Sequence, residues 1–181
     1  MKKLFTIILI IIAGVGIWYV INRNSDSDTN NPQPVSTTSR PDASNATFIF
    51  DDESITLKKG LHEQEIAPNS ALTQETTLTE IIDYGDINGD KKDDAVVVLK
   101  QTSGGSGVFI YLAAYVSGPV NYKGTNAVFI GDRIEPESVS TKNGLVTLNY
   151  LNRKPNEAFS SKPTVSVTQQ FIYKNGELVK R

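Results

Sequence analysis

The 181-residue chain contains no cysteine and only one histidine, His62. Without cysteine, no disulfide can support an exported domain. A usual zinc site takes three or four His, Cys or carboxylate side chains, and this chain can offer only one histidine and no cysteine to it. A G-x-S-x-G turn that would carry a serine nucleophile is also missing. The sequence therefore gives no specific support for zinc chemistry or for a serine hydrolase.

Basic residues are not in excess either. The chain has 18 Lys and Arg residues against 20 Asp and Glu residues; without Lys2 and Lys3, the part from residue 22 onward has 16 against 20, a balance of −4. Because phosphate binding requires a basic patch, we expect no nucleic-acid partner.

The chain begins with a long apolar run. Residues 4–21 carry no charge, and as a helix they would span roughly 27 Å, close to the hydrocarbon thickness of a bilayer. Lys2 and Lys3 precede the run, and Trp18-Tyr19 lies near its far end, where amphipathic rings favour the headgroup region. We therefore predict that residues 1–21 form a transmembrane signal anchor that contacts the lipid bilayer through residues 4–21.

The flanking charges also predict an orientation. By the positive-inside rule, the N-terminus lies in the cytoplasm, the helix crosses the cytoplasmic (inner) membrane once, and the C-terminal part is periplasmic or extracellular. A cleaved signal peptide is the competing interpretation, but no small-x-small site follows the run, since Ala13, Gly14 and Gly16 all lie inside it. An uncleaved anchor fits the pattern better.

Residues 22–46 read as a linker. They are almost entirely Asn, Ser, Asp, Thr and Pro, with Val35 as the only large aliphatic residue. Such a composition cannot bury enough apolar surface to offset chain entropy, so we expect a flexible tether that prolines stiffen locally.

Residues 47–181 have the size of one domain and read as mainly β. Apolar and polar residues alternate with period two in several segments, and Asn143-Gly144 and Asn175-Gly176 are strong hairpin signals. We expect a single antiparallel β domain, either a sandwich or a meander. The expected strands are 47–50, 54–58, 77–84, 94–100, 108–116, 126–131, 135–141, 145–150, 164–173 and 177–180. Residues 61–76 show no clear period and are expected to be a loop or a short helix.

The most specific motif is the stretch from Asp86 to Asp94, which reads D-x-N-x-D-x-x-x-D. Oxygen-bearing side chains at loop positions 1, 3, 5 and 9 suit a hard cation such as Ca²⁺. The predicted ligands are the side chains of Asp86, Asn88, Asp90 and Asp94 and the backbone carbonyl of Lys92. The competing interpretation is a polar Asn-Gly turn with solvated aspartates.

The motif departs from the EF-hand pattern, because Lys91 stands where that pattern has Gly and Val97 where it has Glu. It more closely resembles the calcium loops of integrin-type FG-GAP repeats, which lie between two β-strands and read D-x-N-G-D-x-x-x-D. This resemblance covers only the nine residues 86–94 and implies a calcium ion held by them. No second copy appears in the chain, so a multi-bladed propeller is excluded.

A longer ordered string also carries a resemblance. It comprises residues 85–97, then Gly104-Gly105-Ser106-Gly107 with the strand after it, then Gly131-Asp132-Arg133. It resembles a family of small exported bacterial domains of unknown function, which have a signal or anchor, a linker and one such domain. The resemblance extends over about residues 54–181 and implies export and architecture but no reaction. Lys91 replaces the glycine usual there, which implies weaker calcium binding.

We therefore expect a membrane-anchored extracytoplasmic β domain with a structural calcium site, acting as a binding module for an envelope or extracellular protein or glycan. Two alternatives stay open. The first is a hydrolase of envelope polymers, which needs an acid/base pair; Asp51-Asp52-Glu53 and the pair Glu135 and Glu137 supply carboxylates, but no pattern places them in a pocket. The second is a metal-free structural spacer. The pattern does not fix the oligomeric state.

Overall fold

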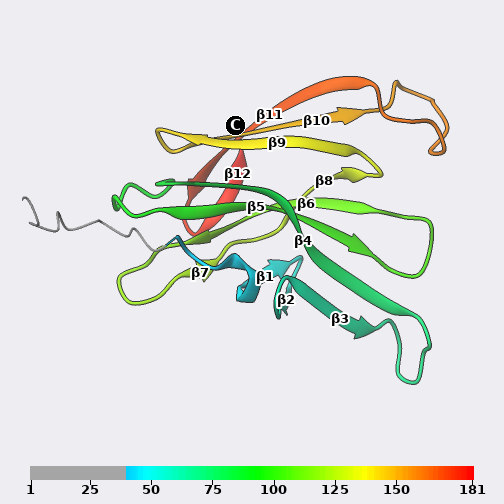
Figure 1. The fold of residues 1–181 in the computed structure, drawn as a ribbon, viewed down its shortest axis with the longest axis horizontal. Helices are drawn as coiled ribbons and strands as arrows, with labels where there is room; N and C mark the ends of the chain where they lie inside the picture. The colour runs from blue at the N-terminus through cyan, green and yellow to red at the C-terminus, as the bar shows by residue number, and fades with distance from the viewer. Residues whose placement is uncertain (1–39) are drawn as a thin grey trace, which may run out of the picture. The chain divides into compact units, whose positions relative to one another are not determined.

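The computed structural model describes residues 40–181 as a β domain built from three antiparallel sheets (Figure 1). This confirms the expectation of a mainly β, antiparallel fold. The predicted anchor and most of the predicted linker lie outside the described residues. Within residues 40–181, no helix is long and apolar enough to cross a membrane.

The central sheet has the strand order β3-β4-β5-β6-β7, and β8 also pairs with β6. Its strands are β3 (Leu61–Glu65), β4 (Thr73–Gly85), β5 (Asp94–Thr102), β6 (Phe109–Val116), β7 (Lys123–Gly124) and β8 (Val128–Asp132). In the middle of this sheet, β5 is buried on both faces from Asp94 to Leu99. That position explains why the sequence of β5 is a continuous apolar run rather than an alternating one.

A second sheet covers one face of the central sheet, as Figure 1 shows. Its order is β12-β11-β10-β9, formed by β9 (Glu135–Lys142), β10 (Leu145–Asn152), β11 (Val165–Lys174) and β12 (Glu177–Lys180). The first hydrophobic cluster fills the space between the two sheets. Val96, Leu112 and Leu148 are among its fully buried members, together with Phe171. Each such side chain contributes about 1.5–3 kcal/mol by leaving water.

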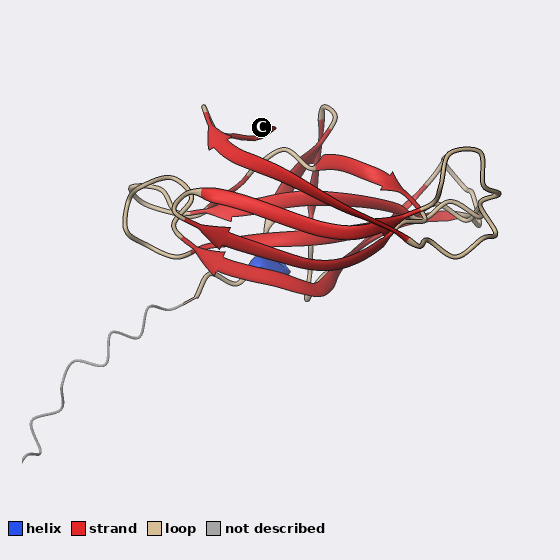
Figure 2. Cartoon of the chain, turned by 90° about the horizontal axis from the view of Figure 1, so that it is seen from above, coloured by secondary structure: helices blue, strands red, loops and turns tan. Residues whose placement is uncertain are grey.

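The hairpin of β1 (Thr47–Phe50) and β2 (Glu53–Thr56) covers the opposite face. A short 3₁₀ helix, η1 (Ala43–Asn45), precedes it and is the blue element in Figure 2. Phe48 and Ile55 pack against the far side of β5 in the second hydrophobic cluster, and Ala43 and Ala46 are buried with them. Ordered, buried residues thus begin inside the stretch that the sequence assigned to the linker.

One prediction of secondary structure is wrong. Residues 61–76 contain β3 and the first part of β4 rather than a loop or helix, and Leu61 pairs with Thr77 while Glu65 pairs with Thr73. This ribbon has no buried residue along β3. Since neither face of β3 lies against a core, its sequence carries no apolar alternation, and periodicity could not reveal it.

The predicted Asn-Gly hairpins are confirmed. Asn143 and Gly144 have φ of 52° and 74°, and Asn175 and Gly176 have φ of 56° and 91°. Two consecutive positive φ values are the requirement of the two-residue turn that matches the twist of a hairpin. These turns join β9 to β10 and β11 to β12.

Candidate functional site

The predicted calcium loop, residues 86–94, connects β4 to β5 at one end of the central sheet, and its last residue, Asp94, is the first residue of β5. The connection from β6 to β7 and the turn from β9 to β10 lie at the same end, on the left of Figure 1. The flanking elements are strands, as the sequence predicted. The glycine-rich stretch 103–107 follows β5 and lies at the opposite end of that strand.

Asp94 is the most buried acidic residue of this end, with no exposed surface. Its Oδ2 accepts a hydrogen bond from the backbone N–H of Ile87 at 2.9 Å, and its Oδ1 accepts one from the N–H of Ser117 at 2.7 Å. Burial raises the pKa of Asp94, those hydrogen bonds oppose the rise, and the nearby charge of Asp90 adds to it. Within residues 40–181, no Lys or Arg forms an ion pair with Asp94.

Ser117, which follows β6, ties the loop to the neighbouring strand. Its hydroxyl donates to Oδ2 of Asp90 at 2.6 Å, and its carbonyl accepts from Nδ2 of Asn88 at 2.8 Å. The hydroxyl bond is the main reason that the pKa of Asp90 is lowered. With its N–H on Asp94, Ser117 therefore contacts three of the five predicted ligand residues.

Asp86 and Asn88 close the loop on itself. Oδ1 of Asp86 accepts from the N–H of Gly89 at 2.6 Å, and its Oδ2 accepts from the N–H of Lys91 at 2.8 Å. Oδ1 of Asn88 accepts from the N–H of Asp90 at 2.9 Å. Gly89 and Lys91 have φ of 85° and 67°, the left-handed conformation that folds the acidic side chains back onto the backbone.

The side chain of Lys92 lies over the same loop. Its ammonium nitrogen is 3.9 Å from Oδ2 of Asp90 and 3.4 Å from the carbonyl oxygen of Gly118. More than half of this side chain is exposed, so the ion pair is screened by solvent and contributes little. The carboxylates of the loop are thus hydrogen-bonded mainly to backbone N–H groups rather than neutralised by bases.

The structure places all five predicted ligand residues on one loop, and their side-chain donors are oxygen atoms, the class that Ca²⁺ prefers. Across the described part of the chain, no group of three or more His, Cys, Asp and Glu side chains is arranged so that it could hold a metal ion. The donor chemistry suits a hard cation, and the calcium assignment stays a prediction.

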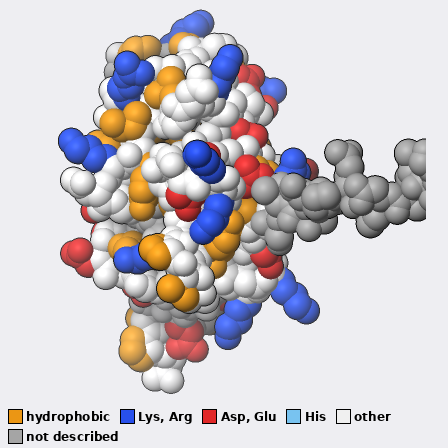
Figure 3. Space-filling model, turned by 90° about the vertical axis from the view of Figure 1, so that its left-hand side faces the viewer, with side chains coloured by type: hydrophobic (Ala, Val, Ile, Leu, Met, Phe, Trp, Pro, Cys, Tyr) orange, Lys and Arg blue, Asp and Glu red, His pale blue; other side chains and the backbone are white. Residues whose placement is uncertain are grey.

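The outer side of the loop borders an open hollow of about 520 Å³. Asp86 and Asn88 line it from the loop, and Thr141, Asn143 and Gly144 line it from the β9–β10 hairpin. Oγ1 of Thr141 is buried and has no hydrogen-bond partner. Figure 3, which views this end of the domain, shows acidic and basic side chains interspersed on the surface.

Sequence reasoning missed Ser117 and Tyr122. The hydroxyl of Tyr122 donates to the carbonyl of Asp93 at 3.1 Å. Both residues lie in the β6–β7 connection, more than twenty positions along the chain from the loop. The sequence has a Gly118-Pro119 dipeptide in this connection, which indicates a turn but not what the turn contacts.

The histidine and the Asp132-Arg133 pair singled out in the sequence lie outside the acidic loop. His62 is half-buried on β3, with Nδ1 at 3.0 Å from the carbonyl of Thr56 and Nε2 at 3.3 Å from Oε1 of Gln64. Asp132 and Arg133 form an ion pair at 2.7 Å, which lowers the pKa of Asp132.

The acidic turn at residues 51–53 borders a separate shallow hollow of about 470 Å³, which Gln101 and Tyr111 also line. The structure thus gives these carboxylates a pocket, which the sequence could not do. Burial raises the pKa of Tyr111, and the charge of Asp51 adds to the rise.

Comparison with known proteins adds no assignment: no protein-family model, no curated protein and no solved structure matches this chain.

Proposed function

We propose that this chain is a membrane-anchored binding module of the cell envelope, whose extracytoplasmic β domain is stabilised by a calcium ion held by residues 86–94. The anchor is the uncharged run at residues 4–21 of the sequence. The partner is an envelope or extracellular protein or glycan.

The observation that carries the calcium proposal is the burial of the Asp94 carboxylate without a basic partner in the described region. A carboxylate with no exposed surface is costly to keep charged unless a cation or several donors compensate it. Asp94 has two backbone N–H donors, no basic partner in the described region, and the charge of Asp90 close enough to raise its pKa. A divalent cation would relieve this repulsion.

The ligands of the proposed ion are the carboxylates of Asp86, Asp90 and Asp94, the amide oxygen of Asn88 and the carbonyl of Lys92. Because the loop connects β4 to β5 and is tied to the end of β6 by Ser117, the ion would lock three adjacent strands of the central sheet. Extracellular modules hold such ions with dissociation constants of about 10⁻⁴–10⁻³ M, and binding then stabilises the fold by mass action.

Calorimetric titration of CaCl₂ into the full-length chain in detergent tests the site. We expect one ion per chain, no comparable heat with MgCl₂, and loss of binding in Asp86→Ala. Asp52→Ala is the matched control, because it removes one acidic charge from the exposed β1–β2 turn and leaves the loop unchanged. Unchanged affinity in Asp86→Ala would show that the ligand assignment is wrong.

A further inference from the structure

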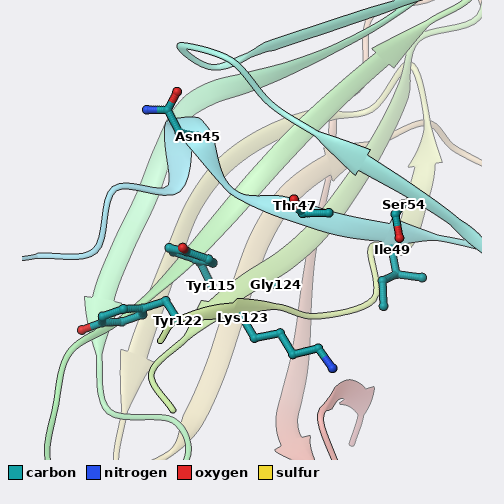
Figure 4. A pocket seen from close by; sticks show the side chains of 8 residues that line it. All are labelled: Asn45, Thr47, Ile49, Ser54, Tyr115, Tyr122, Lys123 and Gly124. Carbon is teal, nitrogen blue, oxygen red and sulfur yellow. The ribbon is translucent and has the colours of Figure 1, made fainter. Parts of the chain in front are cut away.

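Beside the calcium loop lies a small hollow between the β1–β2 hairpin and the β6–β7 connection (Figure 4). Its volume is about 260 Å³, below the range of about 300–1,000 Å³ typical of pockets that enclose drug-sized ligands. We call it the tyrosine hollow. Its lining residues are Asn45, Thr47, Ile49, Ser54, Tyr115, Tyr122, Lys123 and Gly124. The size suits a single ring of a larger ligand.

Two aromatic rings form one wall of the tyrosine hollow. The ring centroids of Tyr115 and Tyr122 lie 5.3 Å apart and their planes are inclined by 31°, so the rings lie one beside the other, as Figure 4 shows. Both residues are half-buried. Tyrosine offers a large, rigid and amphipathic contact surface at low cost in conformational entropy, which favours binding of a ligand that is neither fully apolar nor fully polar.

Apart from Ile49 and Gly124, the rest of the lining is polar and carries a single formal charge. Ser54 presents a hydroxyl group from β2, and Thr47 presents one from β1 that also hydrogen-bonds Oγ1 of Thr56 at 2.8 Å. Lys123 runs along the opposite side in Figure 4. In the part of the chain that the structure describes, no Asp or Glu lies within ion-pair distance of Lys123. The hollow therefore offers hydroxyl partners and one cation that no acidic group neutralises.

The hollow is preformed by backbone contacts. A Cβ atom on Gly124 would lie only 1.8 Å from the carbonyl oxygen of Thr47, so only glycine permits this approach of β7 to β1. Next to it, Ile49 donates its N–H to the carbonyl of Thr125 at 3.1 Å and accepts from the N–H of Ala127 at 2.7 Å. A ligand would meet a rigid floor and would bind without a large ordering cost.

Hydrogen bonds also join the β6–β7 connection, which contributes Tyr122 to the tyrosine hollow, to the acidic loop. Tyr122 donates its hydroxyl to the carbonyl of Asp93, and Ser117, at the start of the same connection, bonds Asp90 and Asp94. The connection that carries Tyr122 is thus held by Asp93 and, through Ser117, by two of the residues that would hold the ion, whereas Tyr115 lies on β6. The loop carboxylates are also the nearby charges that would oppose an anionic ligand, and calcium would neutralise them.

We infer that the tyrosine hollow binds an acidic sugar ring of an envelope glycan, and that calcium in the loop strengthens this binding. The rings of Tyr115 and Tyr122 receive the apolar C–H face of the sugar, the hydroxyl groups of the hairpin hydrogen-bond its hydroxyls, and Lys123 pairs with its carboxylate. The sugar site rests on the hollow itself, whereas its calcium dependence rests on the proposed function.

The test compares two disaccharides that differ in one acidic group. Calorimetry with the full-length chain in detergent would use N-acetylglucosaminyl-N-acetylmuramic acid, which carries a lactyl carboxylate, and chitobiose, which does not. With millimolar CaCl₂ we expect the acidic disaccharide to bind about tenfold more tightly than chitobiose. Removing calcium should weaken the acidic disaccharide by about fivefold or more, the lower range of typical coupling between two sites.

Two substitutions locate the site. Lys123→Met keeps most of the exposed side chain but removes its charge, so it should bring the acidic disaccharide down to the affinity of chitobiose and leave chitobiose unchanged. Tyr115→Leu should weaken both sugars, and a melting curve checks that this variant is folded. If neither disaccharide binds, or if neither substitution changes the binding, the sugar site is wrong; equal binding of the two sugars would overturn its acidic preference.

Calcium titration without sugar separates this inference from the proposed function. Calcium binding with no sugar binding would overturn only the sugar site. The chain could instead give no heat of calcium binding and bind the sugar equally well with and without calcium. That result would overturn the calcium site and the coupling but leave the sugar site standing.

Discussion

The two acidic turns of this domain, residues 51–53 and 86–94, are both rich in acidic residues but differ in solvent exposure and hydrogen bonding. Asp51-Asp52-Glu53, at the turn from β1 into β2, is exposed and lines an open hollow. The stretch Asp86–Asp94 joins β4 to β5 and has its carboxylates hydrogen-bonded to backbone N–H groups and to Ser117. Density of acidic residues therefore says little about a site, whereas their spacing decides whether the side chains turn back onto the loop.

The difference follows from local geometry. In the loop, two left-handed residues, Gly89 and Lys91, fold the chain so that Asp86 reaches N–H groups three and five positions later. In the hairpin turn, only Asp51 has a positive φ, and Asp52 and Glu53 after it are exposed. Substitutions of single acids in the two turns should therefore have very different effects.

The largest effect is expected from Asp94→Ala. The change leaves the buried N–H groups of Ile87 and Ser117 without acceptors, and each unsatisfied buried group costs about 1–3 kcal/mol. We expect the free energy of unfolding to fall by about 2–4 kcal/mol in urea titrations. Asp52→Ala should change it by less than about 0.5 kcal/mol, as usual for an exposed position; an equal loss in both variants would remove the distinction between the two turns.

A smaller effect is expected from Ser117→Ala, which keeps the N–H bond to Asp94 and removes only the hydroxyl. The lost bond is to a partly exposed carboxylate, so we expect a loss of about 1–1.5 kcal/mol of unfolding free energy. The pKa of Asp90 should also rise toward its ordinary value, because the Ser117 hydroxyl is the main cause of its lowering. An Asp90 pKa that does not move in carboxylate NMR would contradict this role of Ser117.

Asp132, unlike the acids of the two turns, is paired with a base, Arg133. Its substitution is expected to have the smallest effect on stability. Arg133 lowers the folded pKa of Asp132 below its unfolded value, so the stabilising contribution is present above that unfolded value, about pH 3.9, and is lost as the pH falls through the folded pKa. The melting temperature of Asp132→Asn should lie slightly below wild type at pH 6, and the gap should close toward pH 3. A gap that widens in acid would contradict this sign.

Much of the fold could be predicted from the sequence, because most strands have one face on a hydrophobic cluster and reveal it by alternation. Val146, Leu148 and Tyr150 on β10 are an example, with less buried residues between them. The tight turns were equally predictable, since Asn-Gly adopts the two positive φ values that they need. The exposed strand β3 has no apolar alternation in its sequence and could not be predicted in this way.

The candidate site was predictable only in part. The spacing of Asp86, Asn88, Asp90 and Asp94 is local and identified the loop. Its anchoring by Ser117 and the adjacent pair Tyr115 and Tyr122 depend on where β6 ends against β5, and a single sequence does not encode that contact in any local pattern. Sites assembled across strands need the fold before their members can be recognised.

The central claim is that the second acidic turn holds calcium and the first does not, and thermal melting tests it most directly. The full-length chain in detergent would be melted with 10 mM CaCl₂ and with a chelator, beside Asp90→Ala and Asp52→Ala. At a dissociation constant of about 10⁻⁴–10⁻³ M, this calcium concentration should stabilise the fold by about 1–3 kcal/mol. We predict a rise of the melting temperature in wild type and Asp52→Ala that is lost in Asp90→Ala and not reproduced by MgCl₂. An unchanged melting temperature in wild type would contradict the account and leave residues 86–94 as a hydrogen-bonded turn.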